Sequence, residues 1–309
     1  MKAIIRSGII ITLFVALIQV THAEGEDLYF IDAHSQVDHN VVPLKRVISI
    51  MEQGGVINTI LSARGKLTGK DLLAFASLYP EHILPAVRTK GAPYEAGSAK
   101  YYKALKAQVA SRKYHAIAEV LLYHAKKGNK APEVIVYPDD KRVQVALDYA
   151  IENGWPFVVH IEFASLNGEK RKKFMRAFKQ MLDQHPEHPF ILTHMGQLTS
   201  NRCLRLIENH KNVYFHTGWS NPAAVESSNQ PWTNVFEGER LAPEWKDIFV
   251  QYPHSFIFAL DNVFAEHWSD FYRKQMNYWK SGLAELPTDV SHLIAHGNAE
   301  RLWGIRQRN

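Results

Sequence analysis

Four residues that can bind a metal ion or move a proton follow short apolar runs of this chain. They are His34 in YFIDAHSQ, His160 in PFVVHIEF, His194 in PFILTHMG and Asp261 in FIFALDN. The apolar runs have the composition of buried strands, so each polar residue is expected where a strand stops. Parallel strands that close into a barrel bring such ends to one rim. Imidazole nitrogen and carboxylate oxygen are ligands of zinc-type catalytic sites, so the pattern predicts a metal centre.

Histidine ends four of the strands that the sequence predicts, at His34, His160, His194 and His216. With 16 histidines in 309 residues, chance would place roughly 0.4 of them at the ends of eight barrel strands. A single histidine at such a position is most often a hydrogen-bonded core residue. Four of them indicate a shared site.

The elements that position these residues are short strands that alternate with amphipathic helices. Two helices have clear limits: Pro138–Asp140 opens one that stops at Asn153-Gly154, and another runs from Gly168 to His185-Pro186. The expected strands are 29–33, 57–62, 83–87, 116–122, 156–160, 190–194, 213–216 and 256–260. Alternation of this kind implies parallel βαβ units. Eight units without a break in composition predict a single-domain (β/α)8 TIM barrel over residues 24–309 instead of an open doubly wound sheet.

Residues 1–23 have the features of a secretory signal peptide. Lys2 and Arg6 precede an apolar run from Gly8 to Val20, and Thr21-His22-Ala23 supplies small residues for cleavage. The run is short for a bilayer span. We therefore expect export to a bacterial periplasm or the medium, and no membrane span in the mature protein.

Composition excludes several other classes of protein. Cys203 is the only cysteine, so no intramolecular disulfide can form. The net charge is +5, or +3 without Lys2 and Arg6. The remaining Lys and Arg residues are mixed with acidic ones along the helices, which is typical of a solvated surface and not of a nucleic-acid-binding stripe. A small-molecule ligand is the expected partner.

At this point the chain resembles the amidohydrolase superfamily, specifically the amidohydrolase-related group that also contains decarboxylases of the aminocarboxymuconate-semialdehyde type. The resemblance covers the whole mature chain. It is carried by IDAHSQ, FVVHIE, LTHMG, ALDN and the C-terminal HGNAERLWGI. The last string is similar to the closing Asn-Ala-x-Arg-Leu-x-Gly segment of the family.

The resemblance implies a TIM barrel and a role for each strand-end residue. His34 and His160 would hold one divalent metal, zinc or else manganese, and Asp261 would touch both metal and water as the proton acceptor. His194 would polarise the substrate carbonyl or stabilise the oxyanion. The metal lowers the pKa of water toward 7, which makes this combination of groups coherent for hydrolysis. Barrels of this type often pair through surface helices, which allows a homodimer.

Two positions near the expected metal need separate treatment. The first strand of the family normally ends in His-x-His, whereas this chain has His34-Ser35-Gln36. Gln36 could coordinate through its amide oxygen, bind substrate, or mark a site that has lost the metal. Glu119 lies on the fourth strand, where binuclear members place a bridging Lys or Glu, so it is the candidate for a second site. A carboxylate paired with Lys or Arg inside the barrel is the alternative.

Candidate substrate contacts lie at other strand ends and in two long loops. Arg64 and Arg88 follow the second and third strands, where a guanidinium could pair with a substrate carboxylate or with an acidic residue of the barrel, Glu119 or Asp38. Trp219 and His216 at the seventh strand could line an apolar side of the pocket. The loops 124–136 and 219–244 are long enough to shape or cover that pocket.

These observations leave three functions open. The first is a hydrolase in which metal-activated water attacks an amide, ester or lactone carbonyl. The second is a non-oxidative decarboxylase of the same family, which the arginines and Gln36 fit. The third is a metal-poor barrel that binds a ligand without turnover, which the change at Gln36 motivates.

Overall fold

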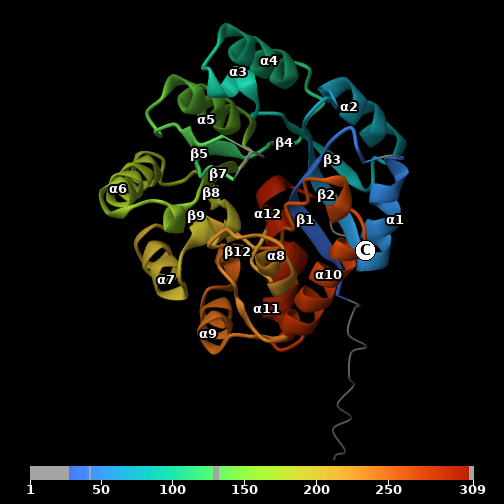
Figure 1. Ribbon diagram of the computed structural model, residues 1–309, viewed down its shortest axis with the longest axis vertical. Helices are drawn as coiled ribbons and strands as arrows, with labels where there is room; N and C mark the ends of the chain where they lie inside the picture. The colour runs from blue at the N-terminus through green and yellow to red at the C-terminus, as the bar shows by residue number, and fades with distance from the viewer. Residues whose placement is uncertain (1–27, 42, 128–131, 306–309) are drawn as a thin grey trace, which may run out of the picture.

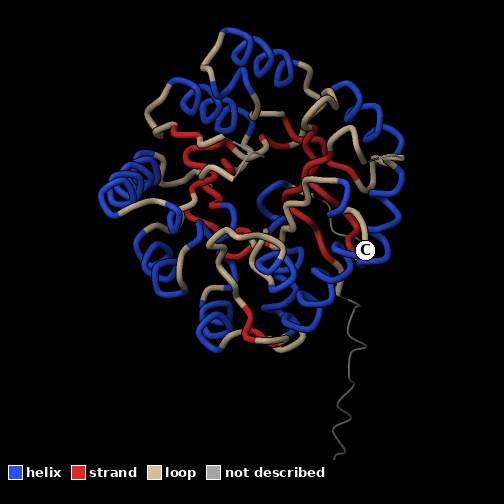
Figure 2. The backbone as a smooth tube through the Cα atoms, in the orientation of Figure 1, coloured by secondary structure: helices blue, strands red, loops and turns tan. Residues whose placement is uncertain are grey.

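The computed structural model describes residues 28–41, 43–127 and 132–305 and shows a ring of strands enclosed by helices (Figure 1). Figure 2 separates the two layers, with strands inside and helices outside. The predicted TIM barrel is therefore confirmed. Its strands are β1 Phe30–Val37, β2 Val56–Ala63, β3 Ile83–Val87, β4 Ala116–Ile117, β5 Val120–His124, β7 Phe157–Ile161, β8 Phe190–Leu192, β9 Val213–His216 and β12 Phe256–Ile257.

Hydrogen bonding divides the barrel into two parallel sheets that meet at two seams. One sheet has the order β1-β2-β3-β4 and the other β12-β9-β8-β7-β5-β6, where β6 (Val134–Ile135) is an antiparallel addition to β5. The first seam is a break at Ala118-Glu119, so the predicted fourth strand is two short strands, β4 and β5. At the second seam β12 meets β1 through Ala33 N–H, which donates to Phe258 O at 3.0 Å.

The second seam also carries Asp32, a carboxylate buried inside the barrel. Its Oδ1 accepts the N–H of Leu260 at 2.9 Å, and its Oδ2 accepts the hydroxyl of Ser35 at 2.5 Å. Ser35 Oγ in turn accepts the N–H of Asn262 at 3.0 Å. Burial raises the pKa of Asp32 to about 6, although these hydrogen bonds oppose the rise. The eighth barrel strand, β12, ends at Ile257, and beyond it the side chains of Asp32 and Ser35 take the place of strand pairing.

The two helices whose limits the sequence predicts, α5 and α6, begin and end at those residues. In α5 the Asp140 side chain accepts the N–H of Arg142 at the N-cap, and Gly154 at the C-cap has a φ of 65°, which favours glycine. The helices are α1 Lys45–Gly54, α2 Gly69–Leu78, α3 Ala92–Glu95, α4 Ala99–Ala110, α5 Lys141–Asn153, α6 Gly168–Gln184, α7 Ser200–Asn209, α8 Pro222–Glu226, α9 Pro243–Gln251, α10 Asp270–Leu283, α11 Thr288–His292 and α12 Asn298–Trp303.

Small and branched residues fill the inside of the barrel, while larger ones pack between strands and helices. The inner cluster contains Ala33, Ala86, Ala118 and Ala259 together with Ala299 of α12. Asn298 at the start of α12 donates to the carbonyl oxygens of Pro253 and Phe256, both at 2.8 Å. The C-terminal HGNAERLWG segment therefore closes one end of the barrel and leaves the other end for a site.

Two further sequence predictions concern the 219–244 loop and the N-terminal residues 1–23. The 219–244 loop contains α8 and a hairpin of β10 (Phe236–Glu237) and β11 (Arg240–Leu241). The predicted signal peptide, residues 1–23, lies outside the described residues and stays a prediction. Among the described residues, no helix has the length and apolarity needed to cross a membrane.

Replacing Asp32 by Ala should lower the unfolding free energy of the barrel. The change leaves the N–H of Leu260 and the hydroxyl of Ser35 without their buried acceptor, which costs roughly 2–4 kcal/mol of unfolding free energy. Urea denaturation followed by circular dichroism measures this. The exposed Asp139 supplies the matched control D139A, and equal stability of the two variants would show that the Asp32 contacts do not hold the seam.

Candidate metal centre

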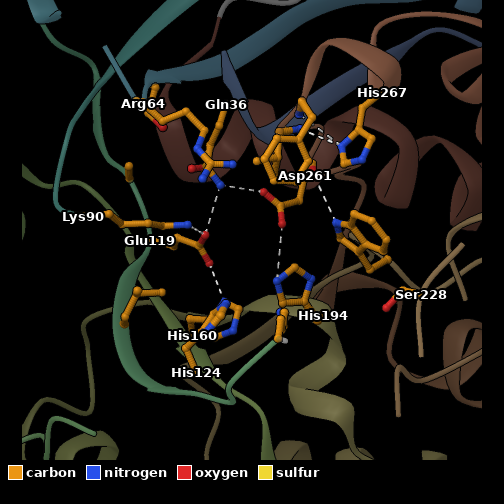
Figure 3. Close-up of a pocket in the computed structure, with 18 of the residues that line it drawn as sticks. Gln36, Arg64, Lys90, Glu119, His124, His160, His194, Ser228, Asp261 and His267 are labelled. Carbon is orange, nitrogen blue, oxygen red and sulfur yellow. Dashed lines mark hydrogen bonds and ion pairs between the residues drawn. The ribbon is translucent and has the colours of Figure 1, made fainter. Parts of the chain in front are cut away.

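A cavity of about 950 Å³ opens at the carboxyl ends of the barrel strands. Its floor is formed by groups from β1, the β4–β5 break, β7, the segment after β8 and the segment after β12. Figure 3 shows that their side chains converge on one point. They include Gln36, Glu119, His160, His194 and Asp261. The structure thus brings together polar residues from the whole length of the chain, as their positions at strand ends predict.

The donor atoms of four residues have roughly the spacing of metal ligands; the residues are His34, Gln36, Glu119 and Asp261. His34 Nε2 lies 3.3 Å from Asp261 Oδ1 and 3.5 Å from Glu119 Oε1. Gln36 Nε2 lies 3.0 Å from Asp261 Oδ1 and 3.2 Å from Glu119 Oε1. Two ligand atoms that each sit about 2.1 Å from a tetrahedral metal are about 3.4 Å apart. The four distances therefore match the edges of a metal site.

The orientation of Gln36 decides whether this set can be completed. In the structure its amide nitrogen donates to both carboxylates, which neutralises them partly without a metal. Rotation of the amide by 180° exchanges its nitrogen and oxygen and places an oxygen donor at the same position. Gln36 therefore occupies the place of a fourth ligand. It is two residues after His34 on β1, so both side chains lie on one face of the strand.

His194 presents an unshared nitrogen to the same space. Its Nδ1 donates to the carbonyl oxygen of Gly218 at 3.1 Å, so the neutral ring has a bare Nε2. That Nε2 is buried without a hydrogen-bond partner among the described residues and lies 3.5 Å from Asp261 Oδ2. Burial and the nearby His160 lower the pKa of His194 to about 3. A neutral acceptor here can bind a metal or a water hydrogen, whereas donation to a substrate oxygen needs a protonated ring.

His160 lies between two carboxylates and forms a second group. Its Nδ1 is 2.7 Å from Glu119 Oε2 and its Nε2 is 3.0 Å from Glu162 Oε1. Glu119, His160 and His194 make one cluster of candidate ligand atoms, and His34, Glu119 and Asp261 make another. The predicted ligand His160 is thus separated from His34 and Asp261 by Glu119, which both clusters share.

The buried carboxylates remain ionised despite the cost of burial. Burial alone would raise the pKa of Asp261, but its contact with His34 and the charge of Lys90 hold it well below its usual range. For Glu162, the contacts with His160 and Lys127 outweigh burial in the same way and lower its pKa. Such charges are stable only while cationic or hydrogen-bonding partners surround them.

Lys90 is another cationic partner of the buried carboxylates and comes from the segment after β3. Its ammonium forms an ion pair with Glu119 Oε1, the oxygen that also faces His34 and Gln36. Burial lowers the pKa of Lys90 to about 7, while the charges of Asp261 and Glu162 oppose the fall. The carboxylate that the sequence assigns to a second metal or to an ion pair is therefore paired with lysine.

The predicted substrate contacts differ in their positions. Arg64, Arg88 and Trp219 line the cavity. Arg88 donates to the carbonyl oxygens of Gly65 and Lys90, and within the described residues neither arginine pairs with Glu119 or Asp38. His216 is not among the residues that line the cavity, and its ring stacks on that of His34 at 5.4 Å. A role for His216 in substrate binding stays a prediction.

Several site residues escaped the sequence analysis. Lys90 is two residues after Arg88, and Glu162 is two residues after His160, so the alternation of strand side chains could have identified both. Lys127 and Trp232 come from the two long loops, whose shape periodicity does not specify. Lys127 pairs with Glu162 at 2.7 Å and lies 4.4 Å from the Trp232 ring.

The backbone at three site residues adopts the left-handed conformation. His194 has a φ of 54°, Trp219 a φ of 59° and Asp261 a φ of 50°. Residues other than glycine are uncommon in this region, although aspartate and histidine are enriched among them, and the conformation persists where the surrounding structure imposes it. For Asp261 the N–H donates to His34 O at 2.8 Å across the β12–β1 seam. The seam therefore aims the Asp261 carboxylate at His34.

Comparisons with known proteins identify the family and the fold of the chain. A family model described as Amidohydrolase matches residues 129–305, more than half of the chain. An uncharacterized TIM-barrel protein from Bordetella bronchiseptica is 17% identical, with a TM-score of 0.56 over 84% of this chain and 82% of its own. No match is found among curated protein sequences.

Two further structures share the fold at low identity. A dihydroorotase from Campylobacter jejuni is 11% identical, with a TM-score of 0.53 over 91% of this chain and 84% of its own. An amidohydrolase from Burkholderia multivorans with bound zinc is 12% identical, with a TM-score of 0.51 over 90% of this chain and 100% of its own. At these identities the likeness concerns the fold alone.

Proposed function

Because the chain belongs to the amidohydrolase family, we propose that it is a metal-dependent hydrolase that cleaves an amide, ester or lactone carbonyl of a small molecule. The observation that carries the proposal is the set of donor atoms on the cavity floor. His34 Nε2 and the carboxylates of Glu119 and Asp261 have ligand spacing. Both His34 Nε2 and His194 Nε2 are buried without a hydrogen-bond partner in the described part of the chain.

We assign the metal to the group of His34, Glu119 and Asp261, with Gln36 joining through its amide oxygen. One nitrogen and three oxygens admit manganese and zinc, and either ion would hold water in a further position beside these four ligands. A bound divalent ion would supply Lewis acidity and acidify water. His160 then acts as a positioning residue, because its hydrogen bond holds the other oxygen of Glu119.

The spacing in the second group favours one metal over two. His160 Nδ1 and Glu119 Oε2 are 2.7 Å apart. That is a hydrogen-bond distance and is shorter than the separation of about 3.4 Å between two ligands of one tetrahedral ion. A proton therefore joins these atoms, and the proposed centre is mononuclear.

Asp261 and His194 have the positions needed to orient an attacking water. Asp261 Oδ2 and His194 Nε2 are 3.5 Å apart, and both are acceptors that face the cavity. A water between them donates one hydrogen to each, which directs a lone pair of its oxygen toward a carbonyl carbon. Asp261 accepts the proton as the new C–O bond forms. It returns that proton to the nitrogen or oxygen that leaves when the scissile bond breaks.

Metal content tests the ligand assignment before any substrate is known. Protein purified without chelators should carry about one zinc or manganese ion per chain, as measured by plasma mass spectrometry, because the donor set fits one ion. The variant H34A should lose it, since His34 is the imidazole ligand. H115A, in which an exposed histidine outside the cavity is removed, should keep it.

Three other results would contradict this assignment in different ways. Absence of metal from the wild type after reconstitution would favour a binding barrel over an enzyme. Retention of metal by H34A together with its loss from H194A would move the ion to the group of His160. Release of carbon dioxide from carboxylic acids without incorporation of water would favour the decarboxylase.

Removing Lys90 should tighten metal binding. Its ammonium competes for Glu119 Oε1, so K90M should lower the Kd for zinc roughly tenfold, which corresponds to about 1.4 kcal/mol. Competition with a chromogenic chelator measures the change. K66M removes an exposed lysine outside the cavity and should leave the Kd unaltered. Weaker zinc binding by K90M would mean that the lysine supports the site instead.

Replacing Asp261 by Asn should abolish proton transfer while the barrel remains folded. Asn keeps the size of the side chain and the backbone bond to His34, but its amide is not a base. We expect kcat to fall at least about 100-fold on whichever ester, lactone or amide the wild type hydrolyses. Circular dichroism and metal content check the fold and the centre, and unchanged turnover would remove Asp261 as the base.

A further inference from the structure

One wall of the cavity carries four cationic side chains, and two of them have no carboxylate within ion-pair distance among the described residues. The wall consists of Arg64, Arg88, Lys90 and Lys127. Lys90 is paired with Glu119, and Lys127 with Glu162. Within the described residues, neither arginine forms an ion pair within 4.0 Å, and a divalent ion on the floor would add to the positive charge. The wall therefore has cationic groups available for a ligand.

Arg64 is the less committed of the two arginines. Its half-buried guanidinium makes no hydrogen bond to the described residues, and it lies 4.7 Å from the Phe264 ring. Figure 3 shows Arg64 and Lys90 directed into the cavity from the same side. Burial lowers the pKa of Arg64, a cost that a bound anion would offset.

Arg88 lies close enough to Arg64 for their charges to interact. Burial and then the charge of Arg64 lower the pKa of Arg88. Backbone carbonyls hold its Nε and Nη1, which fixes the plane of the guanidinium. The charges of Asp261 and Asp38 act on Arg64, but neither forms an ion pair with it within 4.0 Å in the described part of the chain. The two guanidinium groups can therefore still bind an anion, and their forked donors match a carboxylate.

A second wall of the cavity consists of aromatic side chains that contact one another in a row. Trp219 stands 5.7 Å from Trp232, 5.3 Å from His267 and 6.1 Å from Phe271, measured between ring centroids. Phe264 extends the wall at 5.3 Å from His267. These residues all line the cavity. A wall of this kind favours a flat apolar body, because stacked rings gain dispersion and quadrupole contacts.

The two walls meet at cation–π contacts. Arg64 lies over Phe264, and Lys127 lies over Trp232 at 4.4 Å. His194, on the floor, is 4.8 Å from Trp232. A ligand that spans the cavity would thus have its anionic end on one side, its planar body on the other and its middle at the floor.

We propose that the substrate is a planar, unsaturated or aromatic carboxylate that carries the hydrolysable carbonyl, and that Arg64 and Arg88 bind its carboxylate. The inference rests on the proposed function for the identity of the bond that is cleaved. The anion subsite itself depends only on the two arginines and the aromatic wall. It can therefore be tested by binding, and that test does not require turnover.

Isothermal calorimetry of the metal-loaded protein with three probes tests the proposal. Benzoate has both the charge and the planar ring, benzamide lacks the charge, and cyclohexanecarboxylate lacks the planar ring. The wild type should bind benzoate more tightly than either of the others. R64M should weaken benzoate binding tenfold or more and leave benzamide binding unchanged. R64K, which keeps the charge but not the fork, should fall between them.

The exposed Arg176 of α6 provides the matched control, and R176M should bind benzoate like the wild type. Equal affinity of the wild type for benzoate and benzamide, or no binding of either, would overturn the proposal. So would a folded R64M that binds benzoate normally. Preference for cyclohexanecarboxylate would reject the planar body. If R64M does not fold, R64K and R88M provide the same comparison. A protein that binds benzoate through Arg64 but hydrolyses nothing would refute the proposed function and retain this subsite.

Discussion

The burial of ionised carboxylates at the mouth of the barrel is the constraint on which the site depends. Glu119, Asp261 and Glu162 are each nearly inaccessible to solvent. An unpaired charge in such a place costs several kcal/mol, so each carboxylate must have a cation or several donors beside it. The imidazoles and the two lysines meet this requirement, and a divalent ion would meet it for the group of His34. The polar residues of the floor are therefore interdependent.

The closure of the barrel makes this arrangement geometrically achievable. The eighth strand, β12, is short, and Asp32 and Ser35 complete its attachment to β1. At the same seam the N–H of Asp261 donates to His34 O. This hydrogen bond fixes the position of the proposed base, Asp261, relative to His34, the proposed imidazole ligand. Stability at the seam and chemistry on the floor are thus parts of one structure.

The change from His-x-His to His34-x-Gln36 has a counterpart in Lys90. A neutral amide is a weaker ligand than imidazole, and the lysine supplies a competing charge at Glu119. Both features lower the expected affinity for a metal, although His34, Glu119 and Asp261 keep the spacing of metal ligands. On the substrate side, the unpaired arginines and the aromatic wall give the cavity two chemically distinct halves, which is how a pocket fixes the orientation of a small molecule.

The sequence by itself determined the barrel, the strands that carry His34, His160, His194 and Asp261 at or near their carboxyl ends, and the family, because hydrophobic periodicity and local motifs are properties of neighbouring residues. It also indicated that Arg64 and Arg88 face the cavity. Only the tertiary structure decided that β1 continues past His34 to Val37, that Glu119 separates His160 from the group of His34, and that Lys90 is paired with the Glu119 carboxylate. The last two relations depend on side-chain distances across strands far apart in the chain, which strand periodicity leaves undetermined.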